Sequence, residues 1–333
     1  MSRYLNRTAF VSGMAGAAAA AAMPRVGWAQ SPTVLRISIP TVPSNSQNQM
    51  AARFAKLVEE RSRGRLKFEI YPNGQLAKQQ ASIEGLQTGI VDFTLQTNAF
   101  LEPLFPHVAV LDLPFIFKDD QVAERVLDGE VGQGLLDEFK SNGIIGLTWG
   151  AGGWREFENS VRPLHKASDV AGLRIRIQNG EVYAAMCKAL GATPAVIDYA
   201  ETYTALAQKT VDGLEIPAIT TLENKIYEVA KYMSLTNHIY NATPFVMSKM
   251  KYDAMTPDLQ KIITSTAREV LPFWRKLRAQ KQVDAVKELR ARGVPVNEVD
   301  HASFRKAMEP LFAEFRKSIG GGLVDKVVAL TNR

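Results

Sequence analysis

Apolar and polar residues follow two rhythms along this chain, a period of two residues and the longer period of an amphipathic helix. The segment VLRISIP at residues 34–40 predicts a strand, and MAARFAKLVEERSRG at residues 50–64 predicts a helix. The same pair recurs in LKFEIYP, residues 66–72, and KQQASIEGLQTG, residues 78–89. Strands that alternate with helices of about a dozen residues indicate βαβ units and a mainly parallel sheet.

The middle of the chain repeats this pattern, and its last part is helical. Further strands are predicted at IVDFTLQ (90–96), IIGLTWG (144–150), LRIRIQ (173–178), TPAVI (193–197) and VDGLEIP (211–217), and helices at 119–143, 180–191 and 199–210. The run VAVLDLPFIF (108–117) is apolar throughout. From about Asp258 the pattern is helical, with a kink predicted at Pro272, apart from the short strand PVNEV (295–299). Ligands of such sheets bind at the loops that follow the strands.

The first 29 residues have the pattern of a secretory signal peptide. Arg3 and Arg7 precede an apolar run, and the small-x-small pattern at Gly27 to Ala29 predicts cleavage near Ala29. The segment NRTAF resembles a twin-arginine signal but has Thr8 in place of the second arginine, so we expect Sec export and leave Tat export open. The mature chain is therefore expected outside the cytoplasmic membrane, in the periplasm.

Charge and composition narrow the classes of function. The predicted leader contains three arginines and no acid, so its removal lowers the formal charge from +6 to +3, and no nucleic-acid partner is expected. A single cysteine, Cys187, excludes zinc and redox motifs that need paired cysteines. The chain has no G-x-S-x-G, H-E-x-x-H, Walker A or Rossmann glycine motif, and its four histidines lack metal-ligand spacing. We expect no catalytic residue, metal or cofactor.

Arginines at the ends of strands are the candidates for ligand binding. In LRIRIQNG the side chains alternate faces, so Arg174 and Arg176 share one face of the strand. Arg155 follows the glycine-rich segment GAGG after the strand at 144–150. A guanidinium group binds a carboxylate through two parallel hydrogen bonds. The pattern alone also allows a strand with one solvated face, and it allows Arg155 to pair with an acid of the protein.

Several segments in order, from about residue 34 to about residue 330, resemble the DctP-type solute-binding proteins of tripartite ATP-independent periplasmic (TRAP) transporters. The matching segments are FAKLVEERSRGRLKFEIYPNGQL, IEGLQTGIVDFT, LDLPFIF, GWRE, AGLRIRIQN, ALGATP, ETYTALAQKTVDGLEIP and KIYEVAKYMSLTNH. Each fragment alone is a weak signal, and their common order and spacing carry the resemblance.

The resemblance implies an α/β protein with the two-lobed periplasmic binding protein fold. We expect mixed, mainly parallel sheets, a long helix that spans the hinge, and C-terminal helices. Residues 30–152 and about 242–281 would form one lobe, and residues 153–241 and about 282–333 the other. Whether the C-terminal helices form a dimer stays open.

The resemblance also implies which residues bind the ligand. By position, Arg176 matches the arginine that holds the substrate carboxylate, and Arg155 matches a second arginine at the site, whereas Arg174 is expected at the rim. Other positions that match ligand-facing residues are Asn179, Tyr199, Thr97, Asn98 and the loop from Thr41 to Asn48.

One departure from the family pattern concerns the body of the substrate. Relatives that bind sugar acids often read ENP where this chain reads EIP, so Ile216 replaces an asparagine that contacts the ligand. An isoleucine leaves a substrate hydroxyl unpaired at a cost of about 1–3 kcal/mol. With Trp154 and Tyr199 expected nearby, we favour an acid with an aromatic or branched body over a sugar acid.

The expected function is capture of a small organic acid and its delivery to the small and large integral membrane subunits of the transporter. Two alternatives remain open: a secreted enzyme on a two-lobe scaffold, and a periplasmic sensor subunit that uses the same site. The identity of the acid and assistance by a metal ion also stay open.

Overall fold

The computed structural model describes residues 31–332 of this chain. Pro32–Arg333 form one compact unit. The predicted signal peptide, residues 1–29, lies outside the described residues. Within residues 31–332, none of the helices has the length and apolar character that a membrane crossing needs.

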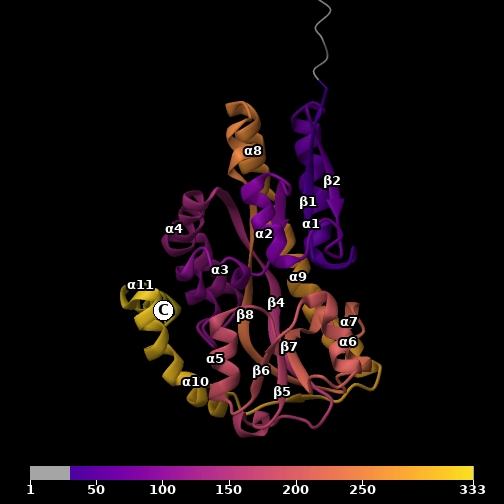
Figure 1. Ribbon diagram of the computed structural model, residues 1–333, viewed down its shortest axis with the longest axis vertical. Coiled ribbons are helices and arrows are strands. Elements are labelled where there is room, and N and C mark those ends of the chain that lie inside the picture. Colours follow the sequence, from indigo (N-terminus) through magenta and orange to yellow (C-terminus); the bar gives the residue numbers. More distant parts are fainter. Residues whose placement is uncertain (1–30, 333) are drawn as a thin grey trace, which may run out of the picture. The chain divides into compact units, whose positions relative to one another are not determined.

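The described chain is a mixed α/β structure (Figure 1). Its strands are β1 (Thr33–Ser38), β2 (Leu66–Tyr71), β3 (Phe93–Leu95), β4 (Ile144–Asn159), β5 (Arg174–Ile177), β6 (Thr193–Val196), β7 (Gly213–Pro217), β8 (Tyr232–Ser248) and β9 (Val296–Glu298). Its α-helices are α1 (Ser46–Arg61), α2 (Gln79–Thr88), α3 (Asp120–Asp128), α4 (Glu130–Glu138), α5 (Glu181–Ala189), α6 (Thr202–Ala207), α7 (Ala218–Glu223), α8 (Lys249–Asp253), α9 (Pro257–Ala291), α10 (His301–Phe315) and α11 (Gly321–Thr331).

The strands form one sheet in the order β2-β1-β3-β8-β4-β7-β5-β6, with β9 beside β8. The long strands β4 and β8 are antiparallel and run through its centre. One end of β8 pairs with β3, and the opposite end of β4 pairs with β7. We call β1–β3 with their helices the β1 half, and β5–β7 with theirs the β5 half. Parallel pairs within each half match the predicted βαβ units.

The junction between the halves contains an irregular stretch of β4. The pairing of β4 with β8 shifts register between Ala151 and Trp154, so the glycine-rich segment that was expected to follow a strand is part of one. The predicted lobe boundaries at residues 152/153 and 241/242 lie inside β4 and β8, and they remain a prediction.

The 35-residue helix α9 spans both halves, as Figure 1 shows. It packs on α1 and β4 and, further along, on α7 and β9. Near its middle the Trp274 ring lies against Gly150 of β4, where a Cβ atom would stand only 2.1 Å from the ring. A glycine at position 150 therefore permits the close approach of α9 to the central strand.

Three segments differ from the sequence prediction. The predicted helix at 119–143 is divided into α3 and α4 at Gly129, and α4 then packs so closely on α3 that a Cβ at Gly132 would lie 1.9 Å from the Leu127 carbonyl oxygen. The apolar run at 108–117 contains a 3-10 helix, Pro106–Asp112. The strand β8 was not recognised, because its polar residues interrupt the expected alternation.

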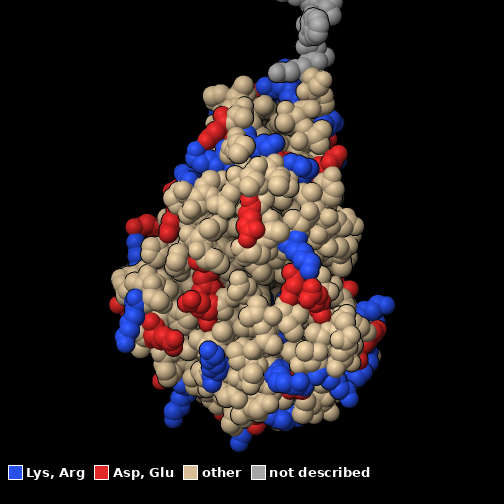
Figure 2. Space-filling view, viewed as in Figure 1, with Lys and Arg blue, Asp and Glu red and all other residues tan. Residues whose placement is uncertain are grey.

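Charged side chains are distributed on the face of the molecule that Figure 2 shows. Lysines and arginines are interspersed with acids across the described part of that face. A continuous basic surface of the kind that a nucleic-acid backbone requires is therefore not present on this part of the molecule.

Candidate functional site

Polar side chains from both halves of the sheet surround one small cavity of about 40 Å³, which opens to solvent. We call it the Arg176 cavity. Its lining from the β1 half and the following loops is Pro40, Thr41, Asn45, Gln47, Gln79 and Thr97; its lining from the centre and the β5 half is Gly152, Arg155, Arg176, Gln178, Tyr199, Ile216, Pro217, Thr220 and Asn241. The cavity thus lies where strand ends of the two halves meet the irregular part of β4.

Arg176 is the most informative residue of this cavity. It is 2% exposed, and its Nε donates to the carbonyl oxygen of Ile197 at 2.9 Å. Among residues 31–332, none of the acids forms an ion pair with it. Burial, followed by the positive charge of Arg155, lowers the pKa of Arg176 to about 10. The group still carries its charge at neutral pH, and a buried charge without a counter-ion is costly. An anion in the cavity would remove that cost.

Arg155, by contrast, has a counter-ion in the protein. Its Nε contacts a carboxylate oxygen of Glu215, and its Nη2 donates to the other carboxylate oxygen at 2.7 Å. Both side chains are at most 2% exposed. Burial alone disfavours the charge, but the attraction and hydrogen bonding of Glu215, together with the attraction of Tyr183 and Asp112, outweigh burial and raise the pKa of Arg155 above its usual range. The sequence left open whether Arg155 pairs with an acid of the protein, and the structure shows that it does. Arg155 nevertheless also lines the cavity.

The remaining Nη1 of Arg155 faces two amides across longer distances. It lies 3.5 Å from Oε1 of Gln178 and 3.4 Å from Oδ1 of Asn241. Both amides line the cavity. These long contacts leave Nη1 able to donate to a ligand in the cavity as well.

Arg174 lies on the surface, as expected for a rim residue. Its Nη2 donates to Oδ1 of Asp212 at 2.7 Å and to the carbonyl oxygen of Lys209 at 2.8 Å. The side chain is 48% exposed. The two arginines of LRIRIQNG therefore differ because Arg176 lies beside β7 and the cavity, whereas Arg174 lies at the strand's outer end.

Three of the other predicted residues also reach the cavity: Thr97, Tyr199 and Ile216. Thr97 donates from its hydroxyl to Oε1 of Gln178 at 3.0 Å, which joins the two halves. The Tyr199 hydroxyl accepts a hydrogen bond from Nδ2 of Asn224 at 2.6 Å, and burial raises its pKa. Ile216 is 3% exposed and also packs in an apolar cluster of the β5 half.

The predicted loop from Thr41 to Asn48 contributes three lining residues, Thr41, Asn45 and Gln47. Its last residues belong to α1, whose first turn is capped by the Asn45 side chain. Asn48 does not line the cavity, but its Nδ2 donates to the carbonyl oxygen and the hydroxyl of Thr41 at 3.0 and 3.1 Å. Asn48 therefore holds Thr41 in place.

Two predicted asparagines are placed away from the Arg176 cavity. Asn98 is fully buried, and its Nδ2 donates to the Val108 carbonyl oxygen and to a carboxylate oxygen of Asp112. Asn179 is exposed and lines a different cavity, together with Glu102. Neither asparagine is among the residues that line the Arg176 cavity.

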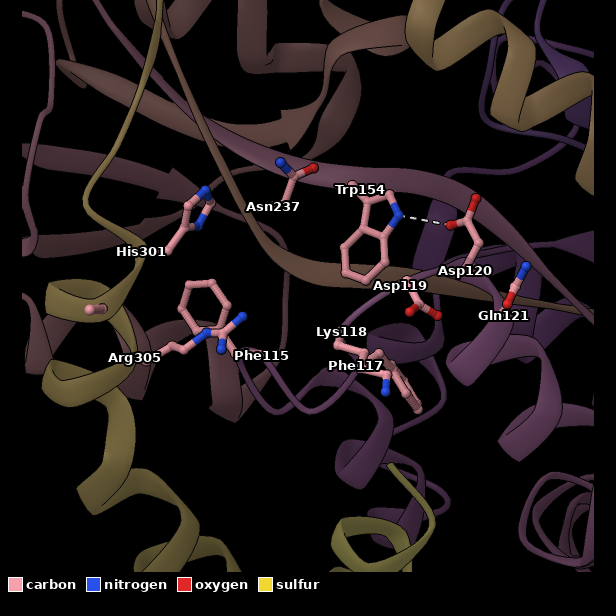
Figure 3. A pocket seen from close by; sticks show the side chains of 11 residues that line it. Phe115, Phe117, Lys118, Asp119, Asp120, Gln121, Trp154, Asn237, His301 and Arg305 are labelled. Atoms are coloured by element: carbon pink, nitrogen blue, oxygen red, sulfur yellow. Dashed lines mark hydrogen bonds between the residues drawn. The ribbon is translucent and has the colours of Figure 1, made fainter. Parts of the chain in front are cut away.

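Trp154 also points away, into a second cavity (Figure 3). Because successive side chains of a strand take opposite faces, Arg155 and Trp154 diverge. The Trp154 Nε1 donates to Oδ1 of Asp120 at 2.8 Å, and its ring packs edge-on against Tyr240. Trp154 therefore no longer supports the hypothesis that the substrate has an aromatic or branched body. Only Ile216 and Tyr199 still support it.

The sequence interpretation missed most of the amide side chains of the cavity. The missed amides are Gln79, Gln178 and Asn241, whereas Asn45 and Gln47 lie in the predicted loop from Thr41 to Asn48. For Gln178 the signal was present, because the alternation that pairs Arg174 with Arg176 continues to position 178 and excludes 179. The others come from separate segments, and no local pattern connects them.

Potential metal ligands are scattered over the part of the chain that the structure describes. There, His, Cys, Asp and Glu residues do not gather in threes or more in a way that could hold an ion. The open question of metal assistance therefore receives no candidate ligand set from residues 31–332.

Comparison with known proteins gives a consistent result. The family model described as bacterial extracellular solute-binding protein, family 7 (DctP) matches residues 38–318. The chain is 34% identical over 275 residues to the 2,3-diketo-L-gulonate-binding periplasmic protein YiaO of Escherichia coli, covering 82% of this chain and 84% of that protein. It is 30% identical to the C4-dicarboxylate-binding periplasmic protein DctP of Rhodobacter capsulatus, covering 90% and 91%.

A solved structure matches the fold over nearly its whole length. It is the sugar acid binding protein DctPAm from Advenella mimigardefordensis in complex with galactonate, with a TM-score of 0.88 and 32% identity over 91% of this chain and 98% of that one. The predicted fold class, an α/β periplasmic binding protein fold with a mixed, mainly parallel sheet, is thereby confirmed.

Proposed function

This chain belongs to the bacterial extracellular solute-binding protein family 7, the DctP family of TRAP transporters, and on that premise we propose that it captures an organic acid in the periplasm. In this proposal the bound acid is delivered, unchanged, to the small and large membrane subunits of the transporter. The periplasmic location rests on the predicted leader and on the names of the two relatives.

One observation carries the proposal. The guanidinium group of Arg176 is buried at the wall of a cavity and, within residues 31–332, has no acid of the protein as its counter-ion. A carboxylate is the natural partner, since its two oxygens match the planar fork of an arginine. We therefore assign Arg176 as the carboxylate anchor, with Nη1 of Arg155 as an additional donor.

Contacts between the halves at the rim support capture by closure. Asn45 donates to Glu223 of α7 at 2.7 Å, Lys78 pairs with Glu201 at 3.0 Å, and the backbone N–H of Glu181 donates to Glu102 at 3.2 Å. A ligand that contacts both halves favours the arrangement in which these pairs form, because it binds that arrangement more tightly than an open one.

The proposal is tested by thermal shift and calorimetry on the mature chain, with a panel of organic acids and their neutral amides. At about 100 times its Kd a cognate acid should raise the melting temperature by about 4 °C. The matching amide should have no effect, and mass spectrometry should recover the acid unaltered. If no acid raises the melting temperature, capture is wrong; chemical conversion of the acid would instead favour the secreted enzyme.

Gln178 and Asn179, which follow β5, should contribute differently to the affinity for the acid. Replacing Gln178 with Ala should weaken binding of the acid about tenfold, because it removes a buried amide that organises Thr97 and Nη1 of Arg155. Replacing Asn179 with Ala should leave the affinity within about twofold, since that side chain is exposed. Calorimetry with the best acid of the panel measures both, and equal losses would contradict the assignment.

A further inference from the structure

The cavity into which Trp154 points has a volume of about 880 Å³ and is open to solvent (Figure 3). We call it the Trp154 cavity. Its lining comes from residues between Phe115 and Gln121, from β4, from Asn237 of β8 and from the first turns of α10. Because Trp154 and Arg155 are successive residues of β4, this cavity and the Arg176 cavity lie on opposite faces of the strand. A volume in this range is typical of sites that hold a small molecule.

Two residues of this lining have a backbone conformation that is unusual for their type. The φ angle is 60° at Phe115 and 43° at Asn237. A bulky residue rarely adopts the left-handed region, because its side chain is crowded there. The backbone N–H of Phe115 donates to the carbonyl oxygen of His238 at 2.7 Å, and this bond to β8 holds the conformation. Strained backbone of this kind is concentrated at functional sites, which points to a role for the cavity.

Aromatic rings form part of the cavity wall. The half-buried Trp154 ring packs edge-on against Tyr240 with 5.3 Å between the ring centroids, and its Nε1 bond to Asp120 fixes its orientation. Phe115 is half-buried as well. Rings that are held in place and partly uncovered offer a surface on which a planar apolar group can pack.

Arg305 of α10 lies beside this aromatic surface. Its Cζ is 5.5 Å from the centroid of the Phe115 ring, and Figure 3 shows the two side chains together. Among residues 31–332, none of the acids forms an ion pair with Arg305. The contact with the ring orients the planar guanidinium group without using its N–H donors. A carboxylate in the cavity could therefore accept two parallel hydrogen bonds from it.

The other charged groups of the lining leave one positive charge for a ligand. Lys118 is exposed and, within residues 31–332, also has no ion pair with an acid. Asp120 is paired with Arg278 at 2.9 Å, and Asp119 caps the first turn of α3. With histidine taken as neutral and Arg278 offsetting Asp120, the charges of Lys118 and Arg305 exceed that of Asp119 by one.

We propose that the Trp154 cavity is a second binding site, which takes a planar aromatic monocarboxylate: its ring packs against Phe115 and Trp154, and its carboxylate binds Arg305. The site goes beyond the proposed capture of an organic acid by Arg176 and does not depend on it, because the two cavities share no lining residue.

Three probes separate the contribution of the ring from that of the charge. Indole-3-acetate has both, indole-3-acetamide has the ring alone, and cyclohexylacetate has the charge without an aromatic ring. Calorimetry uses the mature chain with Arg176→Met, from which the proposed anchor of the other cavity is removed. Indole-3-acetate should bind with a Kd of about 0.1 mM. The other two should bind about fivefold more weakly or worse. Equal affinities for the three probes, or no binding of indole-3-acetate, overturn the inference.

The variant Arg305→Met tests the proposed carboxylate partner, and Lys306→Met is its matched control. Both residues are exposed on α10, but Lys306 lines a different cavity. Arg305→Met should weaken the binding of indole-3-acetate about fivefold or more. Lys306→Met should leave the affinity within about twofold. Equal affinities of the two variants would show that Arg305 does not hold the carboxylate.

Nuclear magnetic resonance of the wild-type chain locates the probe and does not require Arg176→Met to fold. Indole-3-acetate should shift the Nε1–H signal of Trp154, which is assigned by its loss in Trp154→Phe. The signals of Trp149 and Trp274 should stay in place, since these residues are at most 1% exposed. Equal shifts of all three signals, or no shift, contradict the site.

The outcome also separates this inference from the proposed function. A shift of Trp154 by indole-3-acetate in a chain that binds none of the acids in the capture panel contradicts the proposed function alone. Binding of an acid from the panel without any effect of indole-3-acetate on Trp154 contradicts the second site alone.

Discussion

Replacing Arg176 with Met is expected to abolish binding of the acid and, in the ligand-free chain, to raise the free energy of unfolding. Binding should weaken by a hundredfold or more, on the order expected when one partner of a buried charge pair is removed. Stability should rise by about 1 kcal/mol or more, because Met fills much of the same volume without a buried charge that lacks a counter-ion. The two effects have opposite signs, which a merely damaged fold would not produce.

Two matched variants make this prediction specific. Arg176→Lys keeps a charge but loses the planar fork, so its affinity should fall strongly while its ligand-free stability changes little. Arg174→Met removes the neighbouring arginine of the same strand, which is 48% exposed, and should leave the affinity nearly unchanged. Calorimetry measures binding, and urea unfolding of ligand-free protein measures stability. Full binding by Arg176→Met would refute the anchor assignment.

Replacing Arg155 with Met is expected to have the opposite effect on stability. It leaves the Glu215 carboxylate buried without its cation, and the free energy of unfolding should fall by about 3–5 kcal/mol. Glu215 would then take up a proton in the folded state, so its pKa would be higher when folded than when unfolded. The cost of burying the Glu215 charge in Arg155→Met would therefore grow as pH rises. The loss in the free energy of unfolding, relative to wild type, should be smaller at about pH 5 than at about pH 8.

The double variant Arg155→Met, Glu215→Leu provides the control. With both charges removed, its loss of stability should be smaller than that of Arg155→Met alone, since no buried charge remains unpaired. Urea unfolding of ligand-free wild type, Arg155→Met, Glu215→Leu and the double variant gives the coupling energy. The variant Arg174→Met breaks an exposed ion pair. If Arg155→Met lowers the free energy of unfolding no more than Arg174→Met does, the Arg155–Glu215 pair contributes little to the stability of the fold.

The alternation of side chains was a reliable guide wherever a segment stayed within one strand. In LRIRIQ it separated the apolar face from the face of Arg176, and it also placed Gln178 on that face. The assignment of Asn179 came from the family resemblance instead, and the structure places that side chain in the solvent. On β4 the same alternation separates Trp154 from Arg155, so these neighbours could not both line one cavity.

The sequence by itself determined the alternation of strands and helices and the family, and it pointed to Arg176 as the anchor that we propose, because these depend on local patterns and on motifs in a fixed order. Only the tertiary structure decided which charges remain available. Arg155 and Glu215 are 60 residues apart and meet because β4 and β7 are neighbours in the sheet. The net charge of a buried site depends on such long-range pairs, and no local pattern specifies them.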